Sequence, residues 1–257
     1  MDGAVEPRSR KLSGGEAVEI DVSALDEPEL RAEEMELDVV YEDEHLLVVD
    51  KPAGLVVHPS PGHPSGTLVH GLLSRGVAGG DVPERPGIVH RLDRETSGLL
   101  VVTRSAEAHA KMQRLVRRRE LERVYLALVY GRPRSRRGRI EAPIGRDRVD
   151  PTRHSLDTAT PRDAVTHFEV EELTAGHALL RVRLETGRTH QIRVHLEAIG
   201  LPVSGDPVYG VAGDLGLERQ FLHAAQLSFY HPFTGKRVEA SSPLPPDLTA
   251  ALERARF

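Results

Sequence analysis

The densest group of residues that could do chemistry lies in Gly87–Gly98, which reads GIVHRLDRETSG. Asp93 stands here between Arg91 and Arg94, in a polar stretch between two apolar ones. A carboxylate flanked by guanidinium groups stays ionised at neutral pH and can act as a nucleophile or base, while the arginines bind phosphates. The same residues could instead form a charged hairpin turn held by surface ion pairs, and the spacing alone leaves both interpretations open.

A second polar group, GRTHQIRVH, occupies Gly187–His195. It places Arg188 at the start of an expected helix, just beyond a strand end, where polar side chains converge on a pocket in many folds. His190 and His195 are five positions apart, whereas a helical metal pair has its ligands four apart. We therefore interpret both histidines as hydrogen-bonding residues and expect no metal site.

Tyr125 belongs to a third group, Glu122–Ala127. In a strand its ring faces away from Val124 and Leu126. It could stack on a nucleic acid base and offer its hydroxyl to a pocket, or it could be a core tyrosine. The sequence has no Walker loop, dinucleotide-binding glycine fingerprint, G-x-S-x-G elbow or His-Glu-x-x-His motif.

The elements that must position these groups are mostly strands. Apolar alternation predicts strands in adjacent pairs, with a few helices between them. This pattern favours an α+β fold with a mixed, largely antiparallel sheet and flanking helices over a doubly wound parallel sheet. The expected strands are 37–41, 45–50, 88–90, 99–103, 124–130, 165–170 and 179–185, and the expected helices are 67–73, 105–116 and 190–199.

Composition narrows the class of protein. Of 257 residues, 39% are hydrophobic, which suffices for a core. The absence of cysteine excludes disulfides, thiolate catalysis and cysteine-ligated metals. The apolar runs are too short to span a bilayer. The N-terminal residues Met1–Lys11 are polar and no apolar stretch follows them, so the sequence shows no signal peptide pattern. We expect a cytoplasmic protein that is not associated with membranes.

The net charge of −5 conceals a segregation of charge. Residues 1–50 hold 4 Lys/Arg against 16 Asp/Glu, while residues 104–154 hold 15 against 6. A local basic zone on an acidic protein can bind a polyanion. It can also be a solvated, arginine-rich surface, so charge alone does not establish nucleic acid binding.

The order of these motifs resembles that of the RluA-type pseudouridine synthases. Gly87–Gly98 resembles the family signature, and similar motifs precede and follow it, so that the resemblance covers about residues 37–244. Residues 58–67 resemble the RluD-like branch, which acts on large-subunit ribosomal RNA. The other motifs that carry the resemblance are KPAG at 51–54, the segment 123–131, residues 184–195, GDPVYG at 205–210, LHA at 222–224 and HP at 231–232.

The resemblance also implies a domain organisation. Relatives of this branch carry an S-four-like RNA-binding module before the catalytic domain. Here residues 8–22 resemble the last part of such a module, and its helical first part is missing. We expect a remnant of the module and a linker over residues 1–34 and a catalytic domain over residues 35–257.

By this resemblance, Asp93 is the catalytic aspartate. Tyr125 stacks on the target uracil and is the candidate base for the C5 proton. Arg188 matches the arginine that pairs with the aspartate, with Arg193 as the alternative partner, and Leu184 lines the uracil pocket. We further expect Arg91, Arg94, Arg193 and His190 to contact the substrate.

The chemistry agrees with these residue types. Isomerising uridine breaks N1–C1′ and joins C5 to C1′ without a net gain of atoms, so we expect no cofactor. It needs a carboxylate, a base and a dry pocket. Asp93 could attack C1′, attack C6 or take the 2′ proton of the ribose. We expect a monomeric enzyme whose partner is RNA, either ribosomal RNA or a pre-ribosomal particle. Two alternatives are a non-catalytic RNA-binding assembly factor and a glycoside hydrolase, which would need a second carboxylate such as Glu95.

Overall fold

The computed structural model describes residues 30–60 and 62–257, and the expected module remnant at 8–22 lies outside them. Arg31–Phe257 form one compact unit, which begins before the expected boundary at residue 35. Glu33 joins this unit through two contacts. Its backbone N–H donates to His70 O at 3.0 Å, and its carboxylate accepts from Gly66 N–H at 3.0 and 3.1 Å.

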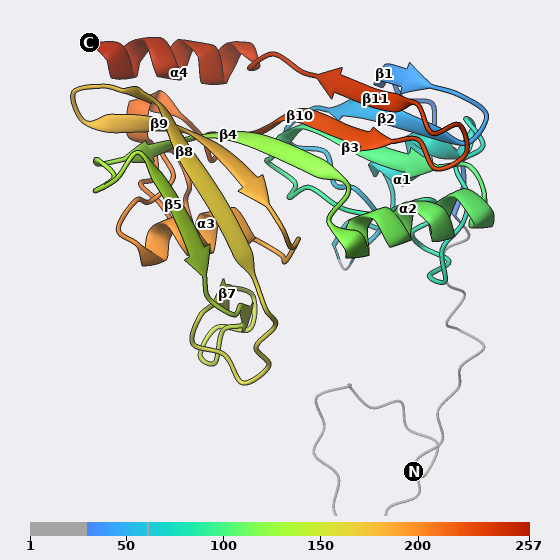
Figure 1. The fold of residues 1–257 in the computed structure, drawn as a ribbon, viewed down its shortest axis with the longest axis horizontal. Helices are drawn as coiled ribbons and strands as arrows, with labels where there is room; N and C mark the ends of the chain where they lie inside the picture. Colours follow the sequence, from blue (N-terminus) through green and yellow to red (C-terminus); the bar gives the residue numbers. More distant parts are fainter. Residues whose placement is uncertain (1–29, 61) are drawn as a thin grey trace, which may run out of the picture. The chain divides into compact units, whose positions relative to one another are not determined.

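The unit is built on a nine-stranded sheet in the order β1-β2-β3-β10-β4-β9-β8-β5, with β11 paired to β10 (Figure 1). All its neighbouring strands run antiparallel except β3 and β10, which are parallel. The mixed, largely antiparallel sheet expected from the sequence is therefore confirmed. The strands are β1 (Asp38–Glu42), β2 (Leu46–Lys51), β3 (Ser97–Thr103), β4 (Glu122–Tyr130), β5 (Arg137–Glu141), β8 (Val165–Leu173), β9 (His177–Leu184), β10 (Leu222–Tyr230) and β11 (Arg237–Ser241).

Helices cover both faces of the sheet because the central strands are apolar on both sides. In β2, Leu47 and Val49 belong to one buried cluster, whereas Leu46 and Val48 belong to another. The first cluster includes side chains of α1 (Leu68–Leu73), α3 (Gln191–Ala198) and α4 (Pro246–Arg256). The second includes Met112 of α2 (Ala106–Arg118). As expected, Ser105 caps α2 by accepting from Ala108 N–H.

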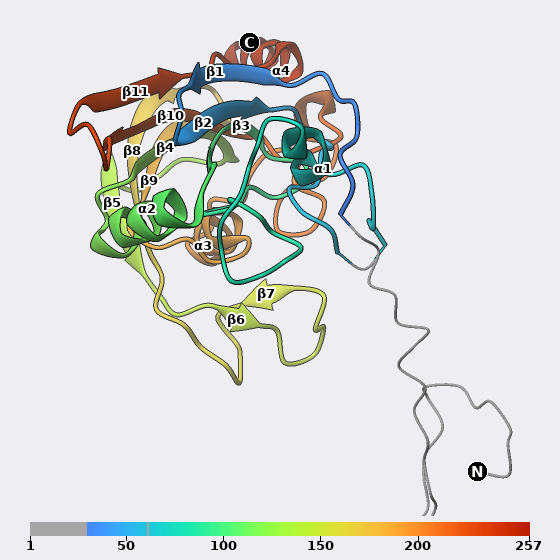
Figure 2. The same cartoon turned by 90° about the vertical axis from the view of Figure 1, so that its right-hand side faces the viewer.

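A separate two-stranded sheet, β6 (Gly145–Arg146) with β7 (His154–Ser155), extends from the segment between β5 and β8. Figures 1 and 2 both place it away from the main sheet, on the side of α3. A short 3-10 helix, η1 (Asp214–Gly216), completes the elements. Within the part of the chain that the structure describes, no helix is long and apolar enough to cross a membrane.

The expected strand at 88–90 is wrong. The structure has a single bridge there, between Ile88 and Val102, followed by bends. The reason is that His90 Nε2, rather than a backbone carbonyl, accepts from Val101 N–H at 3.1 Å. The side chain replaces a ladder hydrogen bond and leaves the chain free to form the loop that carries Asp93.

Gly98 allows this loop to enter β3 close against β10. It has a φ of +108°, and a Cβ at this position would lie 2.3 Å from Ala224 O. A residue with a side chain would therefore push β3 and β10 apart at the point where the Asp93 loop ends.

Candidate active site

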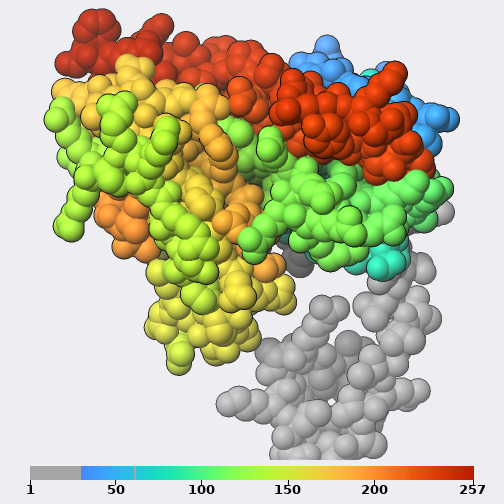
Figure 3. All heavy atoms as spheres, in the orientation of Figure 1, coloured from blue at the N-terminus to red at the C-terminus, as the bar shows by residue number. Residues whose placement is uncertain are grey.

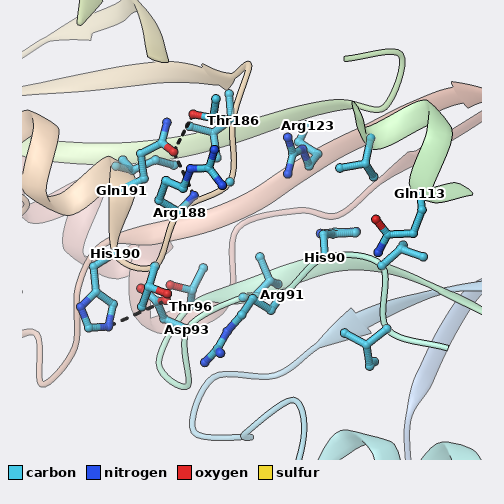
Figure 4. A pocket seen from close by; sticks show the side chains of 18 of the residues that line it. His90, Arg91, Asp93, Thr96, Gln113, Arg123, Thr186, Arg188, His190 and Gln191 are labelled. Atoms are coloured by element: carbon cyan, nitrogen blue, oxygen red, sulfur yellow. Dashed lines mark hydrogen bonds and ion pairs between the residues drawn. The ribbon is translucent and has the colours of Figure 1, made fainter. Parts of the chain in front are cut away.

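A cavity of about 740 Å³ collects residues from all three polar groups of the sequence. It lies between the Asp93 loop, the start of β4, the end of β9 and the start of α3 (Figure 4). The space-filling view shows the surface hollowed between the β8–β9 segment and α2 (Figure 3). The expected site residues that line this cavity are Arg91, Asp93, Tyr125, Leu184, Arg188, His190 and Arg193.

The Asp93 loop is held by backbone contacts from distant segments. Lys51 is fully buried, and its Nζ donates to Pro52 O, Leu55 O and Arg94 O at 2.8–2.9 Å. Gly54 N–H donates to the same Arg94 carbonyl at 3.0 Å. The KPAG turn thus binds the loop directly beside Asp93.

Arg219 holds the loop from the other side. Its Nη1 donates to Glu95 O at 3.0 Å, while Nε and Nη2 bind the Asp247 carboxylate at 2.7 and 3.0 Å. Gln220 Nε2 also donates to Thr96 Oγ1 at 3.2 Å. The loop is therefore fixed at residues 94, 95 and 96, which restricts the position of the Asp93 carboxylate.

Arg193 is the arginine that pairs with Asp93. Its Nη1 lies 3.1 Å from Asp93 Oδ2. The rest of the guanidinium forms a bidentate ion pair with buried Asp206. Nε donates to Oδ2 at 2.6 Å and Nη2 donates to Oδ1 at 2.9 Å. Burial alone would raise the pKa of Asp206, but hydrogen bonds from Arg193, Val208 and Tyr209 lower it below its usual value. Asp206 therefore stays ionised and fixes Arg193 so that its remaining N–H groups face Asp93.

The assignment of Arg188 as partner of Asp93 is corrected by this geometry. Arg188 Nε donates to Asp163 O at 3.0 Å, and its backbone N–H donates to Gln191 Oε1 at 3.0 Å. The chain takes a left-handed conformation at His190, with φ of 57°, immediately before α3. Arg188 lies before this turn and Arg193 in the first turn of the helix after it, so the two point to different partners.

His190 contacts Asp93 from the same turn. Its Nε2 lies 4.0 Å from Asp93 Oδ1, and its Nδ1 lies 2.9 Å from the Tyr209 hydroxyl. That hydroxyl accepts from His154 N–H at 2.8 Å and has its own proton to donate to Nδ1. This arrangement places the ring proton of neutral His190 on Nε2, the nitrogen that faces Asp93. Burial lowers the pKa of His190, which favours the neutral ring.

His195, in contrast, has both ring nitrogens bonded within the core. Nδ1 lies 2.8 Å from Thr166 Oγ1 and Nε2 lies 2.9 Å from Ala142 O. In the described part of the chain, no group of three or more His, Asp or Glu side chains could hold a metal ion.

Tyr125 and Leu184 form an apolar side of the cavity. Tyr125 is 5% exposed, and burial raises the pKa of its phenol. Leu184 ends β9 and packs against the main hydrophobic cluster while lining the cavity. Together they provide a surface of low polarity next to the Asp93 carboxylate, against which a flat nucleobase can pack.

Of the two arginines that flank Asp93 in the sequence, Arg91 lines the cavity and Arg94 does not. Arg91 is exposed, lines the cavity and forms no ion pair with a described residue. Arg94 is absent from the cavity lining. Its Nε pairs with Glu95 Oε1 at 2.7 Å, and its side chain is 54% exposed. The side chain of Glu95 is thus engaged outside the cavity, which argues against a second catalytic carboxylate at this position.

Sequence reasoning missed four residues that organise the site: Lys51, Asp206, Tyr209 and Arg219. The first three stand in the KPAG and GDPVYG motifs, but nothing in those segments says which distant side chain each one meets. Arg219 belongs to no motif that indicated function, and it lies in an irregular segment between η1 and β10. These contacts depend on pairings more than 10 positions apart, such as Arg193 with Asp206.

The site offers a fixed carboxylate paired with a guanidinium, a phenol and an apolar wall inside one cavity. A carboxylate held by a guanidinium can attack an electrophilic carbon or remove a proton, and a buried phenol can exchange a proton at a base placed beside it. The cavity is large enough for one nucleotide turned out of a strand.

Comparisons with known proteins agree with this site. Residues 45–198 match the family model described as RNA pseudouridylate synthase. The chain is 43% identical over 259 residues to an uncharacterized RNA pseudouridine synthase of Bacillus subtilis, covering 100% of this chain and 85% of the relative. It is 45% identical over 270 residues to ribosomal large subunit pseudouridine synthase D of Pseudomonas aeruginosa, covering 100% and 83%.

A solved structure leads to the same family. Human RNA pseudouridylate synthase domain containing 1 matches with a TM-score of 0.65 and 31% identity, over 84% of this chain and 87% of that one. The matched family segment includes Asp93, Tyr125 and Arg193. The chain therefore belongs to the RNA pseudouridylate synthase family and is an enzyme that isomerises uridine in RNA.

Proposed function

We propose that this enzyme converts a uridine of large-subunit ribosomal RNA to pseudouridine, with Asp93 as the catalytic carboxylate. The observation that carries the proposal is the Asp93–Arg193 pair, which holds a carboxylate inside the cavity at 3.1 Å from its guanidinium. The choice of RNA is supported by the relatives named as ribosomal large subunit pseudouridine synthase D.

In this proposal each residue has a separate task. Arg193 orients the Asp93 carboxylate toward the ribose or uracil, and Asp206 in turn holds Arg193 in place. Turning the base out of its stack costs a few kcal/mol. Contact with the Tyr125 ring returns about 1–3 kcal/mol of this cost. Tyr125 is also the proposed base: as phenolate it removes the C5 proton after the uracil has rotated, while N1, released from C1′, takes up a proton.

Mapping of modified uridines tests the proposal. Ribosomal RNA and a pool of transfer RNAs, both transcribed in vitro and therefore free of pseudouridine, are incubated with the enzyme and with Asp93→Asn. We expect pseudouridine at discrete positions of large-subunit RNA with the wild-type enzyme and none with the variant. Modification confined to transfer RNA would refute the ribosomal assignment, and product formed by Asp93→Asn would refute the role of the carboxylate.

We also propose that the enzyme works as a monomer in the cytoplasm. Asp93, Tyr125 and Arg193 meet in one cavity within a single chain, so the proposed chemistry does not require a residue from a second copy. Light scattering of the enzyme with and without RNA checks this, since a dimer that is more active than the monomer would contradict it.

A further inference from the structure

Arg123 is a buried guanidinium in the active-site cavity that lacks a partner. It lies on β4 two residues before Tyr125, so both side chains leave the strand on the same side. Its side chain is 7% exposed, and its Nε is covered and makes no hydrogen bond. Among residues 30–60 and 62–257, no carboxylate pairs with it and no acceptor binds its other nitrogens.

The neighbours of Arg123 do not neutralise its charge. Burial lowers the pKa of His90 to about 3, so this ring is neutral. The Tyr125 phenol is also neutral at pH 7, because burial raises its pKa. Gly187 leaves one side of the guanidinium open, since a Cβ there would lie 3.0 Å from Arg123 Nη1. A buried cation without a partner is costly, so an anion that arrives with the substrate would stabilise it.

Arg123 also lines a second cavity, a groove of about 980 Å³ over β4, β9, β8 and β5. The groove and the active-site cavity share four lining residues, located at the segment that enters β4 and at the end of β9: Arg119, Arg123, Leu184 and Glu185. Its walls hold six arginines against three glutamates, which gives it a net positive charge.

Most of the groove arginines are already neutralised. Arg119 pairs with Glu185, Arg137 with Glu169, Arg139 with Glu141, and Arg181 with Glu171. Arg183 is exposed and forms no ion pair with any other residue that the structure describes. The two groove arginines left for an external anion are thus Arg123, which also lines the active-site cavity, and Arg183, near the end of β9 on the opposite face of the sheet.

We propose that Arg123 binds the phosphate that flanks the target uridine and that the RNA strand on this side leaves the active site through the groove, past Arg183. A planar guanidinium matches two phosphate oxygens, and a positive groove follows a sugar-phosphate backbone. The inference rests on the RNA substrate of the proposed function, although not on which RNA is modified.

Neutral linkages in the RNA test this contact directly. A stem-loop containing a uridine that the enzyme modifies is made as a set, each member with one methylphosphonate in place of a phosphate near that uridine. Binding is measured by fluorescence anisotropy for the wild type, Arg123→Met, Arg123→Lys and Arg183→Met. Arg256→Met is the matched control, because Arg256 lies on α4 outside both cavities and pairs with Glu172.

For the wild type we expect one flanking methylphosphonate to weaken binding about tenfold, the scale of a hydrogen bond to a charged group. Arg123→Met should weaken binding of the unmodified RNA by a similar factor and show no further loss at that linkage. The slope of log K against log salt should fall in magnitude by about 0.7, the value for one contact to a single strand. Arg123→Lys should keep the slope, Arg183→Met should lose sensitivity at the next linkage outward, and Arg256→Met should match the wild type.

The proposal is overturned if Arg123→Met keeps the full sensitivity to every linkage, because Arg123 would then act within the protein alone. If Arg123→Met does not fold, the scan on the wild type still decides, and the absence of any sensitive flanking linkage refutes the contact. The stem-loop is taken from whichever RNA the enzyme modifies. A failure of the ribosomal assignment is therefore seen in the uridine map, and a failure of this inference in the linkage scan.

Discussion

Arg193 Nη1 reaches Asp93 Oδ2 across 3.1 Å, although the two residues are 100 positions apart in the chain. Both ends of this contact are fixed. Asp93 sits on a loop bound by Lys51 and Arg219, and Arg193 is held by the buried Asp206 carboxylate. The pair thus joins the first turn of α3 to the loop before β3, and it orients the carboxylate before any substrate binds.

Arg193→Met should destabilise the protein far more than Arg188→Met. Removing Arg193 leaves the carboxylates of Asp93 and Asp206 without their partner, which costs about 3–5 kcal/mol for a buried pair. Arg188 is only partly buried and bonds to a carbonyl, so its loss should cost about 1 kcal/mol or less. Urea unfolding of both variants measures this ranking. Equal costs, or a larger cost for Arg188→Met, would contradict the observed pairing.

Tyr125→Phe should keep the ring and lose the hydroxyl. We expect RNA affinity close to that of the wild type and a single-turnover rate lower by about a hundredfold, the scale of general-base catalysis. Because burial raises the pKa of Tyr125, the wild-type rate should also increase with pH above neutrality. Tyr125→Leu, which loses the ring, should weaken RNA binding as well. A Tyr125→Phe rate near that of the wild type would reduce Tyr125 to a stacking surface.

Lys51 should give the free energy of unfolding a specific pH dependence. Burial lowers the pKa of Lys51 from 10.5 to about 7, partly offset by the charges of Glu95 and Asp93. Between these two values the unfolded chain binds more protons than the folded protein, so stability rises with pH from about 7 to 10. The cost of burying the charged amine is felt in full below pH 7.

Lys51→Met should remove this rise. Relative to the variant, the wild type should gain at most about 4 kcal/mol between pH 7 and 10, at 1.36 kcal/mol for each unit. Urea unfolding at several pH values measures the difference, with the exposed Lys236→Met as control. If the free energies of unfolding of the wild type and Lys51→Met change with pH in parallel, the Lys51 amine has the same pKa in the folded and unfolded states.

Much of the scaffold was predictable because its signals are local. The alternation in Leu179–Leu184 and the Ser105 cap with apolar positions every third or fourth residue follow from the sequence and match β9 and α2. Strand β5 was not predictable, since Arg137–Glu141 has one apolar residue among its five, Ile140. Pairing with β8 makes this segment a strand, and such pairing has no local signal.

The site was predictable by residue type and less so by contact. Asp93 and Arg193 were recognised, but the choice between Arg188 and Arg193 depends on the left-handed turn at His190, which the sequence does not reveal. The sequence likewise does not reveal how much of the positive charge in segment 104–154 is free to bind a polyanion. In the fold, Arg104, Arg119 and Arg137 pair with glutamates from other strands and loops.

Two deletions should separate the N-terminal segment from the catalytic unit. Removing Met1–Leu30 should leave stability and activity on a short stem-loop nearly unchanged, because Asp93, Tyr125 and Arg193 belong to the unit that begins at Arg31. Removing Met1–Glu33 also removes the Glu33 contacts to Gly66 and His70, and should lower stability by about 1–2 kcal/mol. Thermal melts and activity assays compare the two. If the variant that lacks Met1–Leu30 loses activity on the stem-loop, residues 1–30 are required for catalysis and the expectation is wrong.

The catalytic role of the Asp93 carboxylate is tested most directly by the pseudouridine yield of Asp93→Asn at high enzyme excess, with RNA affinity measured in parallel. Asparagine keeps the size of the side chain, so the cavity and its RNA contacts should persist, while the carboxylate charge that Arg193 holds in place is lost. We expect RNA affinity within a few-fold of the wild type and no detectable pseudouridine, even over long incubation. A yield from Asp93→Asn close to that of the wild type would contradict it, because the isomerisation would then proceed without the carboxylate around which the site is built.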